Sequence, residues 1–134
     1  MLLDCGAYEL KYSLGSESKP RVVFNAVGRN KKTGKVYLGN KLREELDKGT
    51  QHLQVTHPII RGLLQDSNLE HVLWKQDFAK SFGKRFDERQ SCLVMTVQPN
   101  LPNVVQERLC QMVFEDLEFE ACCQVTSHSM IRQD

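Results

Sequence analysis

The sequence lacks the features that mark several classes of protein. It has five cysteines among 134 residues, an odd number without any C-x-x-C spacing, which argues against a disulfide framework and a zinc site. No apolar run approaches the length of a membrane span, and Asp4 interrupts the apolar stretch that a signal peptide would need. We therefore expect an intracellular protein with reduced thiols, no membrane contact and no metal site.

The sequence also lacks an excess of charge of either sign. Eighteen basic residues stand against 17 acidic ones, for a net charge of +1, so the overall field does not steer the chain towards nucleic acid or an anionic membrane. The densest basic run, residues 29–35, contains no aromatic residue on which a base could stack. We interpret this run (Arg29, Lys31, Lys32 and Lys35, around Gly34) as a solvated loop and expect no direct contact with nucleic acid.

The first 28 residues have the pattern of a small antiparallel sheet. Apolar and polar residues alternate through residues 8–14, which is typical of a strand with one buried face. Short apolar runs precede it at residues 1–3 and follow it at residues 21–27, with turn-forming residues between them. These features predict a meander of three strands.

The pattern weakens from residue 29 to residue 62. A loop rich in glycine and lysine precedes a short strand at residues 35–38 and a short polar helix near residues 41–47. We expect this stretch to form a small inserted subdomain. The chain is thereby divided into a first subdomain (1–28), a second subdomain (29–62) and a return to the first subdomain (63–134) that is incomplete at its C-terminal end.

A longer helix is expected after residue 66. Ser67 and Glu70 have the spacing of a capping box, in which the hydroxyl and the carboxylate each satisfy a backbone N–H at the helix start. Apolar residues at spacings of three and four follow, and the helix should end between residues 78 and 82, before Gly83. The predicted apolar side consists of Leu69, Val72, Leu73, Trp74 and Phe78.

The last third of the chain has the order strand, helix, strand. Residues 92–97 are almost continuously apolar, as in a strand buried on both faces. Pro102 suits the first turn of a helix, and residues 119–125 are a second strand candidate. This order predicts a parallel pair with a right-handed crossover and, with the meander, an α/β fold. The predicted buried stripe of the helix consists of Val105, Leu109, Met112, Val113 and Leu117.

Three stretches in this order resemble the actin family. Residues 3–11 (LDCGAYELK) are similar to its first phosphate loop, and residues 27–29 with 37–40 (VGR, YLGN) to the signatures that flank its small second subdomain. Residues 58–62 (PIIRG), followed by Trp74 and Phe78, resemble the Pro-Ile-x-x-Gly and helical Trp-x-x-x-Phe segment of actins. The resemblance implies the N-terminal half of an actin-like ATPase fold, which is ribonuclease H-like.

Within the family, the chain resembles the nuclear actin-related proteins of chromatin remodellers that exchange histone variants. The similarity lies in residues 6–12, in the short connection 30–36 and in residues 114–119 (FEDLEF). It implies a non-catalytic scaffold subunit that supports variant-histone exchange and transcription regulation, in the nucleus and also in the cytoplasm. Its partners would be protein subunits of the remodelling complex and, indirectly, nucleosomes and the variant histone.

The resemblance also implies a nucleotide site at the first loop. Asp4 would hold magnesium through water, while the loop around Gly6 and the ammonium of Lys11 would meet the phosphates. The alternative is structural: Asp4 would be a turn aspartate at a strand end, and Lys11 a solvent-facing strand lysine. ATP with magnesium is thus expected, at most, in the full-length parent.

The loop departs from the family pattern where the chemistry needs it. Cys5 replaces an asparagine, Ala7 replaces a serine that meets the terminal phosphate, and Tyr8 replaces a glycine. Ser127 lies where actin has the glutamine that positions the attacking water, and a serine is too short for that role. We therefore expect no catalytic residues and no enzymatic activity.

Two other functions remain as alternatives. Asp4 and Lys11 favour a nucleotide-binding cytoskeletal actin-related protein, although the loop replacements argue against it. A small-molecule kinase of the same superfamily is disfavoured by the actin-like segment around Trp74. Arg61 replaces an actin histidine below the phosphates, so either an approach to the cleft or a surface salt bridge is expected for it.

Overall fold

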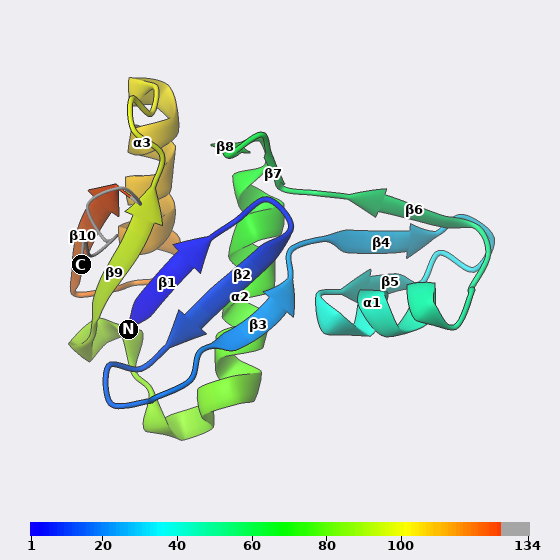
Figure 1. The fold of residues 1–134 in the computed structure, drawn as a ribbon, viewed down its shortest axis with the longest axis horizontal. Helices are drawn as coiled ribbons and strands as arrows, with labels where there is room; N and C mark the ends of the chain where they lie inside the picture. Colours follow the sequence, from blue (N-terminus) through cyan, green and yellow to red (C-terminus); the bar gives the residue numbers. More distant parts are fainter. Residues whose placement is uncertain (127–134) are drawn as a thin grey trace, which may run out of the picture.

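The computed structural model describes residues 1–126 and shows an α/β fold built on one mixed sheet (Figure 1). Five strands lie in the order β10-β9-β1-β2-β3. Their bounds are Leu2–Cys5 for β1, Glu9–Ser13 for β2, Arg21–Phe24 for β3, Cys92–Val97 for β9 and Ala121–Thr126 for β10. The predicted fold class is confirmed.

The meander forms as predicted, but its third strand is shorter than the apolar run suggests. β1 pairs with β2, and β2 with β3, both antiparallel. The run at residues 21–27 is broken at Asn25 and Ala26, where the backbone N–H of Asn25 donates to the Tyr8 carbonyl (2.8 Å). This contact turns the chain out of the sheet, so Val27 begins a different strand.

A second, three-stranded sheet projects from the first (Figure 1). It has the order β5-β4-β6, with β4 at Val27–Asn30, β5 at Val36–Leu38 and β6 at Leu53–Thr56, and α1 (Asn40–Asp47) packs on it. Leu42 of α1 is fully buried against Phe24 and Ala26. A Cβ at Gly28 would lie 2.2 Å from Leu42 Cδ1, so any larger residue there would force the buried Leu42 side chain to shift.

The strands β4 and β6 were not predicted: β4 (VGRN) shows no alternation of apolar and polar side chains, and the four alternating residues of β6 (LQVT) are too few to indicate a strand. The basic side chains of residues 29–35 are exposed, as predicted; Lys31, Lys32 and Lys35 lie in the loop after β4, whereas Arg29 belongs to β4 itself. A small hairpin, β7 (Ile59–Ile60) and β8 (Leu63–Leu64), leads to the long helix that follows.

The long helix α2 (Ser67–Phe82) does not begin with the predicted capping box. Its N-cap is Asp66, whose carboxylate accepts from the backbone N–H groups of Asn68 and Leu69. Ser67 is the first helical residue, and its hydroxyl accepts from Arg108 Nε (2.6 Å). Glu70 is fully buried and makes no bond back to the helix start, so the capping-box prediction is wrong.

The buried side of α2 is also rotated from the predicted one. Glu70, Trp74, Phe78 and Phe82, each four residues apart, face the sheet together with Leu73. Val72, predicted on the apolar side, is 45% exposed. The helix therefore buries a carboxyl group among aromatic side chains, which a count of apolar residues cannot predict.

The strand, helix, strand unit has the predicted parallel pairing of β9 with β10. Pro102 is the N-cap of α3 (Asn103–Gln111) rather than a residue of its first turn, and the helix ends in a π-helical turn, Met112–Asp116. Two short 3₁₀ turns, Gly83–Arg85 and Glu88–Gln90, connect α2 to β9. β10 begins at Ala121 and not at Phe119, which is buried in the preceding loop.

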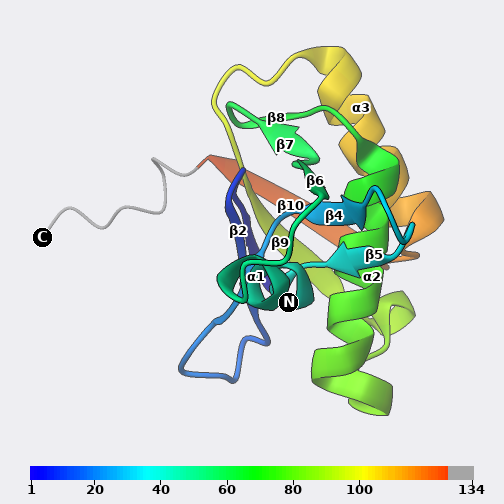
Figure 2. The same cartoon turned by 90° about the vertical axis from the view of Figure 1, so that its right-hand side faces the viewer.

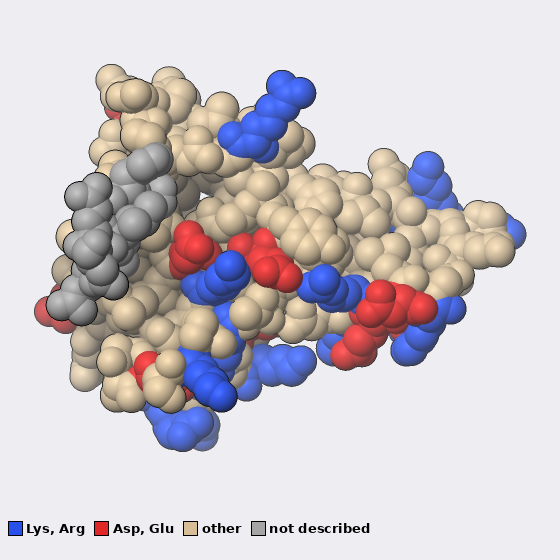
Figure 3. Space-filling model, in the orientation of Figure 1, with Lys and Arg blue, Asp and Glu red and all other residues tan. Residues whose placement is uncertain are grey.

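The helices α2 and α3 cover the same face of the main sheet (Figures 1 and 2). Leu3, Leu10 and Tyr12 point from the sheet to these helices and form the core with residues of α2, α3 and β9. Only alternate residues of β9 are buried, because no helix among the described residues covers the opposite face. The prediction of a strand buried on both faces is thus wrong for β9. On the face seen in Figure 3, basic and acidic side chains are interspersed.

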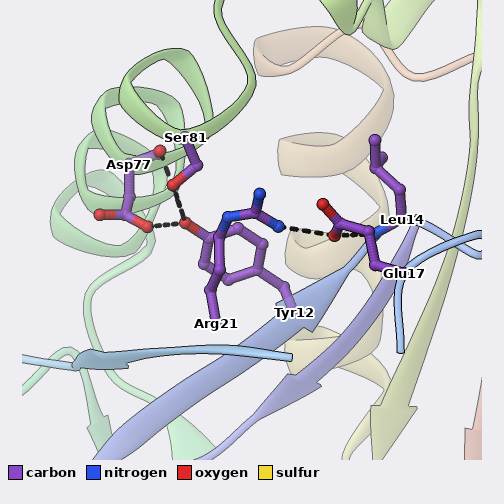
Figure 4. A network of polar contacts seen from close by, with 6 residues as sticks. All are labelled: Tyr12, Leu14, Glu17, Arg21, Asp77 and Ser81. Carbon is purple, nitrogen blue, oxygen red and sulfur yellow. Dashed lines mark hydrogen bonds and ion pairs between the residues drawn. The ribbon is translucent and has the colours of Figure 1, made fainter. Parts of the chain in front are cut away.

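A polar network ties the meander to α2 (Figure 4). The hydroxyl of Tyr12 donates to the Asp77 carboxylate and lies 2.6 Å from Ser81 Oγ. Beside it, Arg21 pairs with Glu17 (2.6 Å) and lies over the ring of Phe82.

Candidate functional site at the first loop

A cavity of about 280 Å³ opens at the carboxyl ends of β1 and β9. In open α/β sheets, ligands bind outside the carboxyl ends of parallel strands, and β1 and β9 are parallel here. The floor comes from the ends of these strands and the loop after β1, and the walls come from α3 and the β7–β8 hairpin. The lining residues are Asp4, Cys5, Gly6, Ala7, Ile59, Gly62, Leu64, Met95, Thr96, Val97, Gln98, Leu101, Val105 and Leu109.

Asp4 and Lys11, two of the predicted site residues, are direct partners across the β1–β2 hairpin. Both are exposed, and both lie on the sheet face that the helices leave open, where they line a second hollow of about 260 Å³. Thr96 of β9 donates to Asp4 Oδ1 (2.5 Å) and so orients that carboxylate. Thr96 was not predicted as a site residue, since a single threonine in an apolar strand carries no signal.

Gly6, the third predicted site residue, closes the hairpin between the two strands. Its N–H donates to the Glu9 carbonyl (3.1 Å), so this donor is already occupied. A Cβ at Gly6 would lie 2.6 Å from that same oxygen. The glycine is therefore required by the tight turn itself, with or without a phosphate nearby.

Ala7 and Tyr8 occupy different surroundings within the loop. Ala7 lines the cavity and presents only a methyl group. Tyr8 does not line it: its ring packs edge-on against Phe24 (5.1 Å between centroids) and stacks with His57 (6.5 Å). The guanidinium of Arg43, from α1, lies over the same ring (5.6 Å). Tyr8 thus joins the first loop to the second sheet and leaves the cavity open.

Below the loop lies a buried polar cluster centred on Glu70. Its Oε1 accepts from Trp74 Nε1 (2.8 Å), Cys5 Sγ (3.1 Å) and Asn25 Nδ2 (3.3 Å). Asn25 Nδ2 also donates to the Gly6 carbonyl (2.9 Å). Glu70 therefore contacts the loop twice, through the thiol of Cys5 and through the amide of Asn25.

Burial raises the pKa of the Glu70 carboxyl to about 7, and the hydrogen bonds from Cys5, Trp74 and Asn25 offset this only in part. Burial and the adjacent Glu70 carboxyl raise the pKa of the Cys5 thiol well above its ordinary value. Cys5 is therefore protonated at neutral pH and serves as a hydrogen-bond donor, not as a nucleophile.

The remaining predictions have mixed outcomes. Trp74 is fully buried in the core, as expected. Arg61 is exposed at the β7–β8 turn with φ 52°, does not line the cavity and makes no ion pair with any described residue, so neither expectation for it is met. Ser127 lies outside the described residues. Within residues 1–126, no group of three or more metal-ligating side chains is found, and no helix is long and apolar enough to cross a membrane.

The site fits a phosphate ligand in part. Asp4 lines the cavity, and Lys11 lies opposite it on the neighbouring strand, so a carboxylate that could hold magnesium through water is present at the strand end. The loop supplies a methyl group where the family pattern has a hydroxyl, and its glycine N–H is occupied. Asp4 could hold the magnesium of a bound ATP at this cavity, whereas Lys11 lines only the second hollow and not the cavity itself.

The meander, the inserted second sheet and the parallel unit, with a loop of Asp, Gly and Lys at the strand ends, define the N-terminal portion of an actin-like fold. The family model described as Actin matches residues 1–131. The chain belongs to the actin family, as the resemblance predicted.

The relatives are named as actin-related proteins, and several of them carry the name ARP6 or actin-related protein 6. "Actin-like protein ARP6" of Cryptococcus neoformans is 32% identical over 124 residues, which cover 90% of this chain and 24% of the relative. "Actin-related protein 6" of Neurospora crassa is 27% identical, covering 89% and 27%. "Actin-related protein 2" of Schizosaccharomyces pombe is also 27% identical, covering 89% and 32%. The chain thus spans about a quarter to a third of the length of these relatives.

Proposed function

We propose that this chain belongs to a non-catalytic actin-related scaffold subunit of a chromatin-remodelling complex. The subunit supports exchange of a histone variant and transcription regulation, and it resides in the nucleus and also in the cytoplasm. Its partners are protein subunits of the complex and, through them, nucleosomes and the variant histone. The similarity to relatives named actin-related protein 6 supports this subclass.

The observation that carries the non-catalytic part of the proposal is the chemistry of the first loop. Ala7 faces the cavity with a methyl group, and the Gly6 N–H is bonded to Glu9 within the hairpin. A transferred phosphoryl group needs donors aimed at its oxygens, and the loop offers few of them. The fold is kept while the groups that stabilise a reacting phosphate are reduced.

The connection between β4 and β5 supports a role outside filaments. Only residues 31–35 separate these strands, and the turn is closed by the backbone N–H groups of Lys32 and Thr33, which donate to Asn30 Oδ1. In actin, a long mobile loop of the second subdomain takes part in polymerisation. A tight turn of this size leaves no such segment for contacts along a filament.

The first test is affinity purification of the endogenous full-length protein from nuclear extract, with mass spectrometry of the proteins that accompany it. Recovery of a remodelling ATPase together with histone-variant subunits is the expected result. Recovery of cytoskeletal proteins alone would overturn the nuclear assignment.

A second candidate is a nucleotide-binding cytoskeletal actin-related protein, favoured by the adjacent Asp4 and Lys11. Thermal unfolding of the full-length protein with and without ATP and magnesium separates the two, because a ligand stabilises the state that binds it. We expect little or no rise in Tm for the wild type. A rise that is lost in Asp4→Ala would show a working site and favour the second candidate.

A further inference from the structure

Glu70 is a buried acid with one unpartnered oxygen. It has no exposed surface, and all three of its hydrogen bonds fall on Oε1. Oε2 is buried without a hydrogen-bond partner. An ionised carboxylate in such surroundings is strongly disfavoured, because half of its charge is neither solvated nor paired.

Asn25 also carries a buried oxygen that lacks a hydrogen-bond donor. It is also fully buried, and its Oδ1 is an acceptor without a donor. The two side chains are already joined through Asn25 Nδ2 and Glu70 Oε1 (3.3 Å). Both unpartnered atoms are acceptors, so a single proton on Glu70 Oε2 supplies the donor that the pair lacks.

We propose that Glu70 is held as a neutral carboxylic acid that pairs with the amide of Asn25, and that this pair is the proton-sensitive positioning device of the first loop. The pair reaches the loop through the bond from Asn25 Nδ2 to the Gly6 carbonyl (2.9 Å) and through the Cys5 thiol. Loss of the proton leaves two buried acceptors without a donor, which is unfavourable. Water can reach and satisfy them once the hydrogen bonds to Cys5 and Gly6 break, so deprotonation should free the first loop.

The titratable neighbours of the cluster come from several elements. His71 lies next to Glu70 on α2, and its Nε2 is buried without a partner. From the segment between β6 and β7, His57 Nδ1 donates to the Asn25 carbonyl (3.1 Å). β1 contributes Asp4 and Cys5, and burial keeps the thiol protonated by raising its pKa. The two histidines are thus the groups whose titration must be separated from that of Glu70.

The molecule contains its own reporter of this proton. Trp74 is the only tryptophan in the sequence, and its indole N–H donates to Glu70 Oε1. We would follow the Trp74 indole and the Gly6 and Ala7 amides of the full chain by ¹⁵N–¹H NMR from pH 5 to pH 9, together with tryptophan fluorescence. Since burial raises the pKa of Glu70 to about 7, the expected midpoint lies there.

The expected result is one shared midpoint for the indole and the loop amides, lost in Glu70→Gln and kept in His71→Gln and His57→Gln. Glutamine retains the Oε1 acceptor and places an N–H donor where the proton would be, so its loop should stay in the low-pH state. A midpoint that survives Glu70→Gln, or that disappears in either histidine variant, would overturn the proposal. An indole that titrates while the amides of Gly6 and Ala7 do not would refute the positioning role.

Infrared spectroscopy of the wild type keeps the proposal testable even where Glu70→Gln does not fold. A buried carboxylic acid has a C=O stretching band that a carboxylate lacks. We expect this band at pH 6 and its loss above pH 8. Its absence at pH 6 would overturn the proposal.

Discussion

Tyr12 on β2 donates its phenolic hydrogen bond to the carboxylate of Asp77 on α2, which joins the meander to the long helix (Figure 4). The two residues lie 65 positions apart in the chain. The ring of Tyr12 packs edge-on against Phe78 and Phe82 in the same contact. Burial and the bond to Asp77 raise the pKa of Tyr12, so the phenol remains a donor throughout the neutral range.

Tyr12→Phe should destabilise the fold without changing its core packing. The variant keeps the ring and loses the hydroxyl, which leaves the Asp77 carboxylate without this donor. We expect a loss of about 1–2 kcal/mol in the free energy of unfolding, measured by urea denaturation. Asp77→Asn and the double variant complete a cycle, and additive losses in that cycle would contradict a direct interaction.

Asp66→Ala should weaken the start of α2. Asp66 accepts from two N–H groups of the first turn, and removal of such a cap costs about 1 kcal/mol. Ser67→Ala is the matched control: it removes only the bond to Arg108 and should cost less. A larger loss in Ser67→Ala, measured by the same denaturation, would restore the capping box that the sequence suggested.

Gly6→Ala should lower Tm in the complete absence of nucleotide. The added Cβ would meet the Glu9 carbonyl oxygen at 2.6 Å, and that oxygen belongs to the backbone of the same tight turn. The strain of such overpacking is expected to cost about 1–3 kcal/mol. Gly15→Ala is the control, since nothing lies within 4 Å of a Cβ there. Equal Tm values for the two variants would show that the turn can adapt.

Glu70 should make stability fall as pH rises. Burial raises the pKa of its carboxyl from an ordinary value of 4.5 to about 7 in the folded protein. Between pH 4.5 and pH 7 the folded state keeps the Glu70 proton, whereas the unfolded state has released it. The stabilisation that is fully present below pH 4.5 is therefore lost as the pH rises through about 7. The wild type should lose roughly 3 kcal/mol relative to Glu70→Gln across this window.

The measurement for Glu70 is the difference in unfolding free energy between the wild type and Glu70→Gln at each pH. This difference removes the contributions of the exposed carboxylates, which are common to both proteins. A difference that does not change between pH 4.5 and pH 7 would show that Glu70 titrates normally. His71→Gln should follow the wild type.

The segments with strong periodicity could be predicted from the sequence, and those held by distant contacts could not. Residues 92–97 and 103–111 form the strand and helix that their patterns indicate. β4 and β6 are four-residue strands, too short for their local pattern to indicate a strand, and they are held by pairing with each other and by packing with Leu42. Their register depends on a long-range partner and not on local propensity.

The candidate site, too, could be predicted from the sequence only in part. The motif around Asp4, Gly6 and Lys11 placed the loop correctly, since a hairpin forms from neighbouring residues. The support beneath the loop was missed, because Glu70 resembled a helix-capping residue and lies 65 positions from Cys5. The spacing of Glu70, Trp74, Phe78 and Phe82 is the one signal in the sequence that this acid faces the core.

The sequence by itself determined the family, the α/β order of elements and the methyl group that Ala7 places in the first loop, since these follow from residue identity and local spacing. Only the tertiary structure decided that Tyr8 packs towards the second sheet and that Glu70 lies buried beneath the first loop. The physical reason is that burial, and the shift in pKa that it produces, depends on which distant segments exclude water from a side chain.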